Sequence, residues 1–138
     1  MAKKIPYGLT DYLRIVTEDY YYVDKTRYIE DLEKTAAFLF LIRPRRFGKS
    51  LFLNMLYCYY DVRYADKFDE LFGNQYIGKH PTSEQGKYLV LYFNFSAVRG
   101  TGEALEENFN MYAKIQMEAF ADQYASYFEP GFSQGIRE

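Results

Sequence analysis

The chain has 138 residues, which suffice for one domain at most, with a hydrophobic content of 49% and an aromatic content of 20%. This composition excludes a disordered chain, and a formal net charge of −2 excludes a general attraction to nucleic acid. The single cysteine, Cys58, excludes an intramolecular disulfide and a cysteine-cluster metal site. No signal peptide is visible and no apolar run reaches the roughly 18 residues of a membrane span, so we expect a cytoplasmic protein without membrane contact.

The first 35 residues predict a short helix, a strand and a capped helix. Asp11 to Val16 have the apolar spacing of a helical turn or two. Residues 19–23 contain three consecutive tyrosines and have strand propensity; we interpret them as a half-buried strand, and stacking of bases on the rings is the alternative. Asp24 suits a helix N-cap and predicts a helix over residues 25–33, although residues 24–26 could instead contact a nucleotide base or ribose.

A basic loop between two apolar segments dominates the middle of the sequence. Residues 36–42 are continuously apolar, which predicts a parallel strand covered on both faces. Residues 49–60 are apolar on nearly every side, which predicts a buried helix. The loop between them ends in Gly48, Lys49 and Ser50. A strand, a tight basic loop and a helix in this order are typical of a phosphate-binding loop.

The chemistry of such a loop assigns a role to each of its last residues. Gly48 allows a sharp turn and a close approach of the backbone to phosphate. Lys49 is expected on the β- and γ-phosphates of ATP, and Ser50 on the Mg²⁺ ion that accompanies them. The predicted nucleotide-binding residues are Arg43, Pro44, Arg45, Arg46, Phe47, Gly48, Lys49 and Ser50.

The loop departs from the general pattern G-x-x-x-x-G-K-[ST] at its first position. Arg43 stands where the pattern has glycine, and Pro44 restricts Arg43 to extended geometry. The loop therefore need not wrap phosphates in the standard way. The arginines at 43, 45 and 46 add positive charge that could bind phosphate directly.

The second half of the sequence predicts two further helices and one strand. Residues 64–72 predict a short helix that ends at Gly73, and residues 73–87 predict a loop. Residues 88–95 predict a second central strand that ends near Asn94, an uncharged side chain that could hydrogen-bond a Mg²⁺-bound water but cannot act as a base. Residues 102–128 predict a long amphipathic helix with an aromatic stripe.

Three motifs together resemble the predicted AAA-ATPase-like family of bacterial proteins. Residues 40–51 look like its phosphate loop, in which the Arg-Pro-Arg-Arg form is usual. Residues 21–26 resemble its Tyr-Val-Asp-Lys-Thr signature, and residues 91–96 resemble its apolar strand ending in Asp/Asn-Phe-Ser. The motifs occur in the family's order and cover residues 5–96 or more.

The resemblance implies a three-layer α/β phosphate-loop fold, of which we expect residues 1–138 to be the N-terminal portion. Within it, residues 1–35 would form an N-terminal segment and residues 36–138 the core strands and helices. It also implies an ATPase using ATP and Mg²⁺, often followed by a restriction-endonuclease-like nuclease domain. Family members place an acidic strand ending in Asp-Glu later in the chain, and no such strand follows residue 96 here. We therefore expect nucleotide binding with little turnover by this segment alone.

Two other functions remain open from the sequence. One is a non-catalytic interaction module with a degenerate loop, which Arg43 and the aromatic surface favour. The other is nucleic-acid binding through the loop arginines and the tyrosines, which the net charge disfavours. The expected partners are a nucleotide and, through open sheet edges or the aromatic helix face, a second copy of the chain.

Overall fold

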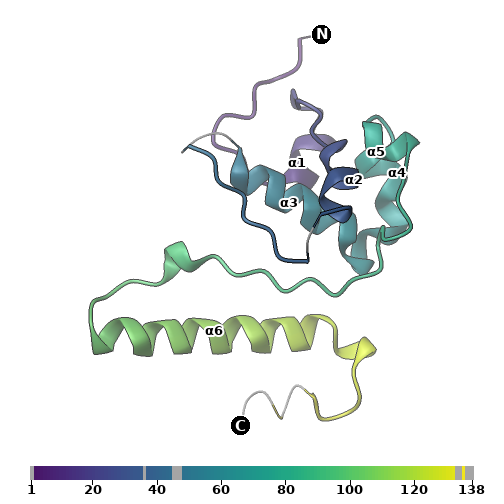
Figure 1. Ribbon diagram of the computed structural model, residues 1–138. Coiled ribbons are helices and arrows are strands. Elements are labelled where there is room, and N and C mark those ends of the chain that lie inside the picture. Colours follow the sequence, from purple (N-terminus) through teal and green to yellow (C-terminus); the bar gives the residue numbers. More distant parts are fainter. Residues whose placement is uncertain (1, 36, 45–47, 133–134, 136–138) are drawn as a thin grey trace. The chain divides into compact units, whose positions relative to one another are not determined.

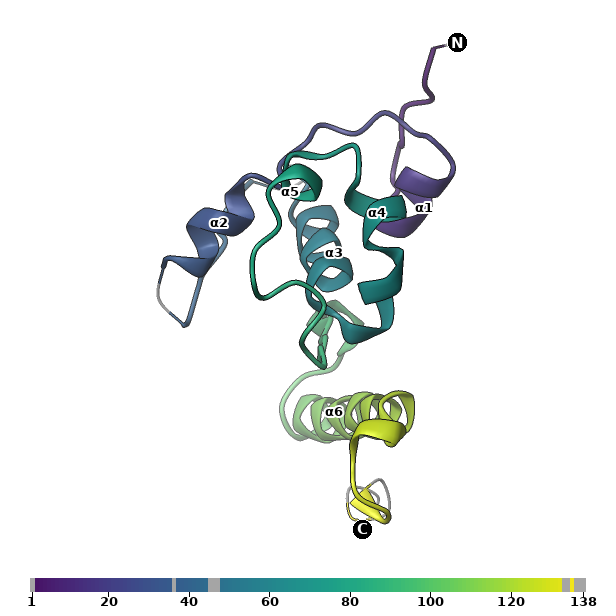
Figure 2. The same ribbon diagram turned by 90° about the vertical axis from the view of Figure 1, so that its right-hand side faces the viewer.

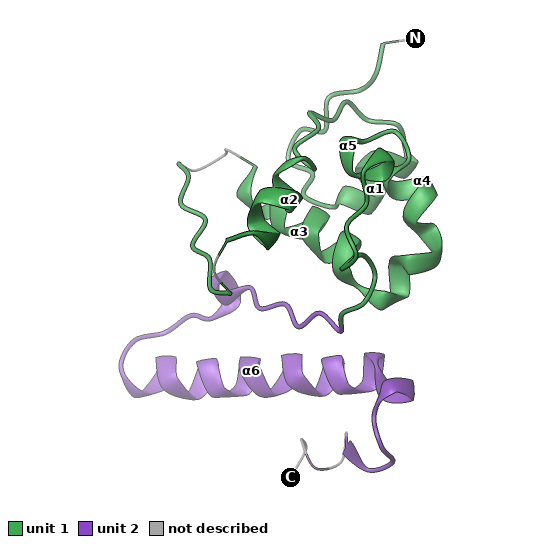
Figure 3. Ribbon diagram, turned by 45° about the vertical axis from the view of Figure 1, so that its right-hand side comes forward, with its two compact units in different colours: residues 1–88 green, residues 89–138 purple. Residues whose placement is uncertain are grey.

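Helices provide the regular secondary structure of the residues that the structure describes. The computed structural model describes residues 2–35, 37–44, 48–132 and 135, which divide into two compact units, residues 1–88 and residues 89–138 (Figure 3). The first unit contains five α-helices and a 3₁₀ helix among the described residues: α1 (Tyr12–Thr17), α2 (Tyr28–Glu33), α3 (Lys49–Tyr60), η1 (Val62–Lys67), α4 (Phe68–Phe72) and α5 (Tyr76–Lys79) (Figure 1). The second contains η2 (Phe95–Ala97), α6 (Glu103–Gln123) and η3 (Ala125–Tyr127).

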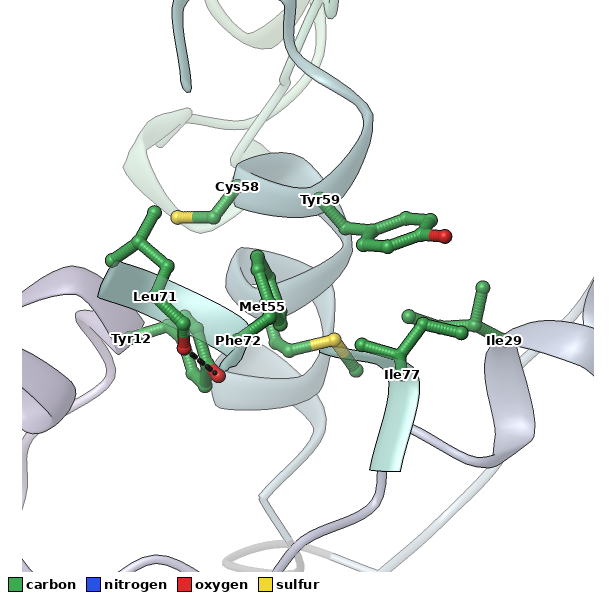
Figure 4. Packing of buried hydrophobic residues seen from close by; sticks show 8 residues of the cluster. All are labelled: Tyr12, Ile29, Met55, Cys58, Tyr59, Leu71, Phe72 and Ile77. Atoms are coloured by element: carbon green, nitrogen blue, oxygen red, sulfur yellow. Dashed lines mark hydrogen bonds between the residues drawn. The ribbon is translucent and has the colours of Figure 1, made fainter. Parts of the chain in front are cut away.

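Helix α3 is the centre of the first unit. Its buried residues Met55, Cys58 and Tyr59 have i, i+3, i+4 spacing and therefore lie on one face. Side chains from α1, α2, α4 and α5 converge on this face, and Figure 4 shows them. In Figure 2, α3 lies between α2 on one side and α4 on the other. The buried residues of this core are Tyr12, Ile29, Met55, Cys58, Tyr59, Leu71, Phe72 and Ile77.

Helix α1 is attached to this core by polar contacts of Tyr12. The Tyr12 hydroxyl donates to the carbonyl oxygen of Leu71 at 2.8 Å, drawn as the dashed line in Figure 4. The Tyr12 backbone N–H donates to Oδ1 of Asn54 at 2.7 Å. Asp11 caps α1 by accepting from the backbone N–H of Arg14, so the helix predicted near residues 11–16 is confirmed.

The second unit consists of α6 and the segment that precedes it. The Tyr112 hydroxyl of α6 accepts from the backbone N–H of Asn94 at 2.7 Å, and the Tyr124 hydroxyl accepts from that of Val90 at 3.3 Å. Two glutamates, Glu103 and Glu106, lie in the first turn of α6, where negative charge favours the helix dipole. The long helix predicted over residues 102–128 is confirmed. Its α-helical part is shorter than predicted, because α6 ends at Gln123 and the 3₁₀ helix η3 follows.

The predicted three-layer α/β fold with a parallel sheet is wrong for the described residues, which contain helices and no sheet. Strand-like pairing there is limited to one isolated parallel bridge between Asp61 and Tyr88. A continuously apolar segment becomes a central strand only when neighbouring strands satisfy its backbone and helices cover its faces. Residues 37–44 have no such cover: Phe38, Phe40 and Ile42 are 88%, 92% and 83% exposed.

Other predicted elements also differ from the structure. The strands predicted at residues 19–23 and 88–95 form no ladder among the described residues; Tyr88 contributes only the isolated bridge, and Phe95 begins η2. The helix predicted over residues 25–33 begins only at Tyr28, after Arg27 as N-cap. The loop predicted over residues 73–87 contains α5. The helix predicted over residues 64–72 is divided into η1 and α4, with Gly73 at its end as expected.

Candidate functional site

The N-terminus of α3 is shaped by a glycine in the left-handed region. Gly48 is the N-cap, with φ 75° and ψ 22°, a conformation that side chains disfavour. Its carbonyl oxygen accepts a helical hydrogen bond from the N–H of Phe52 at 2.9 Å. The N–H groups of a first turn have no acceptor within the helix, and the first turn of α3 has no acidic side chain. This end of α3 is therefore electrostatically suited to an anion.

The structure describes five of the eight predicted binding residues. Lys49 and Ser50 are the first two residues of α3; Lys49 is half-buried and Ser50 is exposed. Arg43 and Pro44 are exposed in the irregular segment before the loop. Arg45, Arg46 and Phe47 lie outside the described residues. Of the five described residues, Gly48, Lys49 and Ser50 are the three that form the N-terminal end of α3.

A lysine from another segment lies beside this helix end. A methyl group added at Gly48 would lie 3.8 Å from Nζ of Lys25, which is ordinary van der Waals distance. The ammonium group of Lys25 is thus close to the N-terminus of α3, although 23 residues separate the two in sequence. The sequence favoured a helix cap for residues 24–26, with a contact to a nucleotide base or ribose as the alternative, and did not distinguish Lys25 from its neighbours. The only available signal was its position within the Tyr-Val-Asp-Lys-Thr signature.

A cavity of about 350 Å³ lies between the segment around Lys25 and the N-terminal part of α3. Lys25 and Gly48 lie on its wall together with apolar and aromatic side chains from α3 and from residues 21–23. Its lining residues are Pro6, Tyr21, Tyr22, Val23, Lys25, Gly48, Leu51 and Phe52. Its volume is within the range of roughly 300–1,000 Å³ that is usual for small-molecule sites, and its mixture of apolar wall and few polar groups is also usual.

The residues on either side of Lys25 are hydrogen-bonded to α5. Oδ1 of Asp24 accepts from the backbone N–H and the hydroxyl of Thr26, at 2.8 and 2.6 Å. Oδ2 of Asp24 accepts from the N–H of Tyr76 at 2.7 Å, and the Thr26 hydroxyl oxygen accepts from the N–H of Ile77 at 3.1 Å. Asp24 therefore satisfies the N-terminus of α5 instead of capping the helix that follows it in sequence.

Tyr22 forms part of the cavity wall and remains protonated at neutral pH. Burial, and to a smaller extent the nearby Asp24 carboxylate, raise the pKa of its hydroxyl to about 12, against a hydrogen bond from the Lys25 backbone that lowers it. The Tyr22 ring also packs edge-on against Tyr12 of the core, with 5.2 Å between the ring centroids. The cavity wall is therefore attached to the hydrophobic core of the first unit.

The described residues supply no obvious metal centre. Among them, no group of three or more His, Cys, Asp or Glu side chains is arranged to hold a metal ion. Oδ1 of Asn94, the side chain considered for a Mg²⁺-bound water, accepts from the N–H and hydroxyl of Ser96 at 3.2 and 2.6 Å.

None of the helices in the described part of the chain is long and apolar enough to cross a membrane.

A glycine-capped helix end with lysines beside it has the electrostatic character that suits an anion. The model of the predicted AAA-ATPase family matches residues 6–137, and the chain belongs to this family, as its motifs indicated. A 55-residue segment is 51% identical to part of an uncharacterized protein in the vnfD 5′ region of Azotobacter chroococcum mcd 1; it makes up 39% of this chain and 11% of that protein. No solved structure matches the chain significantly.

Proposed function

We propose that the chain binds ATP at the N-terminus of α3, as part of an ATPase. The observation that carries this proposal is the left-handed Gly48 at the N-cap, followed directly by Lys49 and Ser50. This arrangement presents backbone N–H groups, the positive end of a helix and a lysine to the same point. Membership of a family of predicted AAA-ATPases supports a nucleoside triphosphate over other anions.

The residues present fit the proposed ligand. Lys49 would bind the β- and γ-phosphates as a point charge, and the exposed hydroxyl of Ser50 would coordinate Mg²⁺. Bound Mg²⁺ would neutralise phosphate charge. Within the described residues of α3, the absence of an acidic side chain from the first turn leaves nothing there to repel a phosphate. Arg43 would add positive charge near the phosphates without replacing the glycine of the general loop pattern.

We propose binding without appreciable turnover for this chain. Phosphoryl transfer depends on positioned metal ligands and on a group that orients the attacking water, and these supply much of the rate. The candidate from the sequence, Asn94, is neutral, and Ser96 already uses its side-chain oxygen. Release of phosphate from ATP above the background rate, lost in Lys49→Ala, would contradict this part of the proposal.

The test of binding is calorimetric titration of Mg·ATP into the chain and two lysine variants. We expect saturable binding by the wild type and a loss of affinity of roughly tenfold or more in Lys49→Ala, because a charged hydrogen-bond partner is removed. Lys67→Ala is the matched control, since Lys67 is an exposed lysine of the same unit in η1. Equal weakening of both variants, or binding abolished by moderate salt in all three, would indicate nonspecific charge attraction.

A second candidate function is an interaction module, and one observation favours it. The five consecutive apolar residues Phe38 to Ile42 are all exposed in the described part of the first unit. Exposed contiguous apolar surface marks interaction sites in soluble proteins, and an extended apolar segment can pair with a strand of a partner. The occupant that we infer is a second copy of the chain. Sedimentation velocity should then show a concentration-dependent dimer that Phe40→Asp abolishes.

A further inference from the structure

The ammonium group of Lys25 lies at a point where positive charge is already concentrated. It is beside Gly48, at the N-terminal end of α3, and Lys49 is the next residue of the chain. The N-terminus of a helix carries roughly half a positive charge, so Lys25 adds to a like charge there. Among the described residues, no carboxylate lies within 4.0 Å of the Lys25 ammonium to offset it. An anion bound at this point would interact favourably with all three groups.

The local structure holds Lys25 in this place. Asp24 and Thr26 each accept a hydrogen bond from the backbone of α5, and the Thr26 side chain is completely buried. Because both neighbours are attached to α5, the backbone of Lys25 has little freedom to move away from α3. A lysine whose backbone is fixed loses less entropy when its side chain binds a ligand. The segment 24–26 therefore combines two residues that are hydrogen-bonded to α5 with an exposed lysine between them.

Space for a ligand adjoins the ammonium group. The cavity of about 350 Å³ has both Lys25 and Gly48 on its wall, so a group seated at the end of α3 can reach both. Its other walls are apolar or aromatic and offer no competing carboxylate. A phosphate chain at the helix end, with the rest of the ligand toward the aromatic wall, satisfies these features.

We propose that Lys25 is a second phosphate-binding residue, acting with Lys49 on a bound nucleoside di- or triphosphate. This inference rests on the proposed function, since it concerns the same helix end. Asp24 and Thr26 are positioning residues that hold Lys25 through α5 and do not contact the nucleotide. The chemistry required at position 25 is a long cationic side chain, and a neutral side chain of similar length would not replace it.

The test compares Lys25→Ala and Lys25→Met with wild type, Lys49→Ala and the control Lys34→Ala. Lys34 is an exposed lysine of the same unit at the end of α2. The titrants are Mg·ATP and inorganic tripolyphosphate, so that phosphate binding is measured with and without the nucleoside. We expect both Lys25 variants to bind each titrant about tenfold more weakly than wild type, with Lys34→Ala unchanged. Lys25→Met preserves the aliphatic stem and decides the result if Lys25→Ala is unstable.

The outcomes separate this inference from the proposed function. Wild-type binding that is lost in Lys49→Ala but kept in both Lys25 variants would overturn the role of Lys25 and leave the nucleotide site in place. Weakening with ATP but not with tripolyphosphate would also overturn it, because Lys25 would then contact the nucleoside. A wild type that binds neither titrant would refute both proposals together.

Discussion

Replacement of Gly48 by alanine tests the geometry of the helix end directly. At φ 75° and ψ 22°, an L-residue with a Cβ is strained by about 1–2 kcal/mol. Among the described residues, the added methyl group would meet only Nζ of Lys25, at 3.8 Å, so no overlap with them adds to this figure. We therefore expect Gly48→Ala to lower the free energy of unfolding by about 1–2 kcal/mol, from backbone strain alone.

The assay is urea denaturation of three variants, followed by titration with Mg·ATP. Gly8→Ala is the matched control, because Gly8 has φ 72° and a methyl group there would lie more than 4 Å from every other described residue outside its chain neighbours. It should lose similar stability without any change in nucleotide affinity. Gly48→Asn should recover much of the stability, since asparagine tolerates the left-handed region better than alanine. Gly48→Ala should bind ATP more weakly, because relief of the strain would turn the N–H groups away from the phosphate. Gly48→Asn should bind more nearly as the wild type does, because it keeps the left-handed conformation.

Two results would refute this reasoning. If Gly48→Ala is as stable as the wild type, the residue does not have a left-handed conformation in solution. If Gly8→Ala weakens Mg·ATP binding as much as Gly48→Ala does, the loss of affinity follows from general destabilisation and not from the shape of the helix end.

Two further predictions concern the core. Asp61 is completely buried, and its carboxylate accepts a hydrogen bond from the Arg63 guanidinium at 2.8 Å. Arg63→Ala should therefore lower the free energy of unfolding by about 2–3 kcal/mol, which is less than for a fully buried pair because Arg63 is partly exposed. A loss below about 0.5 kcal/mol in urea denaturation would contradict this pairing. Burial raises the pKa of Cys58 to about 12 from 9.0, and that of Tyr22 to about 12 from 10.0. Since the unfolded state loses these protons first, the stabilisation is complete below pH 9 and falls as the pH rises from 9 through 12; a melting temperature that is constant between pH 8 and 11 would refute it.

Three helices, α1, α3 and α6, were predictable because local chemistry determines them, whereas α5 lies in a segment predicted as a loop. Asp11 provides a cap for α1, and the spacing of Met55, Cys58 and Tyr59 defines the buried face of α3. Cys58 is buried as predicted for a small core residue. The long aromatic stripe that predicted α6 recurs at helical spacing over about six turns.

The strands were not predictable, because a strand depends on partners that the sequence does not name. Phe38 and Phe40 belong to a segment with the composition of a central strand, yet both are exposed in the first unit. Helix hydrogen bonds form within a segment, whereas sheet hydrogen bonds require a second segment beside it. Apolar composition alone therefore indicated burial that the described residues do not provide.

The candidate site was predictable only in part for a related reason. Gly48, Lys49 and Ser50 are adjacent in sequence, so their motif could be recognised directly. Lys25 reaches the same point through a long-range contact, and the assignment of Asp24 as a helix cap concealed it. Asp24 does cap a helix, but that helix is α5, about 50 residues further along the chain.

An NMR titration of the ¹⁵N-labelled chain with Mg·ATP tests whether the N-terminal turn of α3 is a nucleotide site, because each backbone N–H is observed separately. We expect the largest saturable shifts at Gly48, Lys49 and Ser50, with smaller shifts at Lys25 and none at the Lys67 control. Shifts spread over surface lysines, or concentrated outside the first unit, would contradict it.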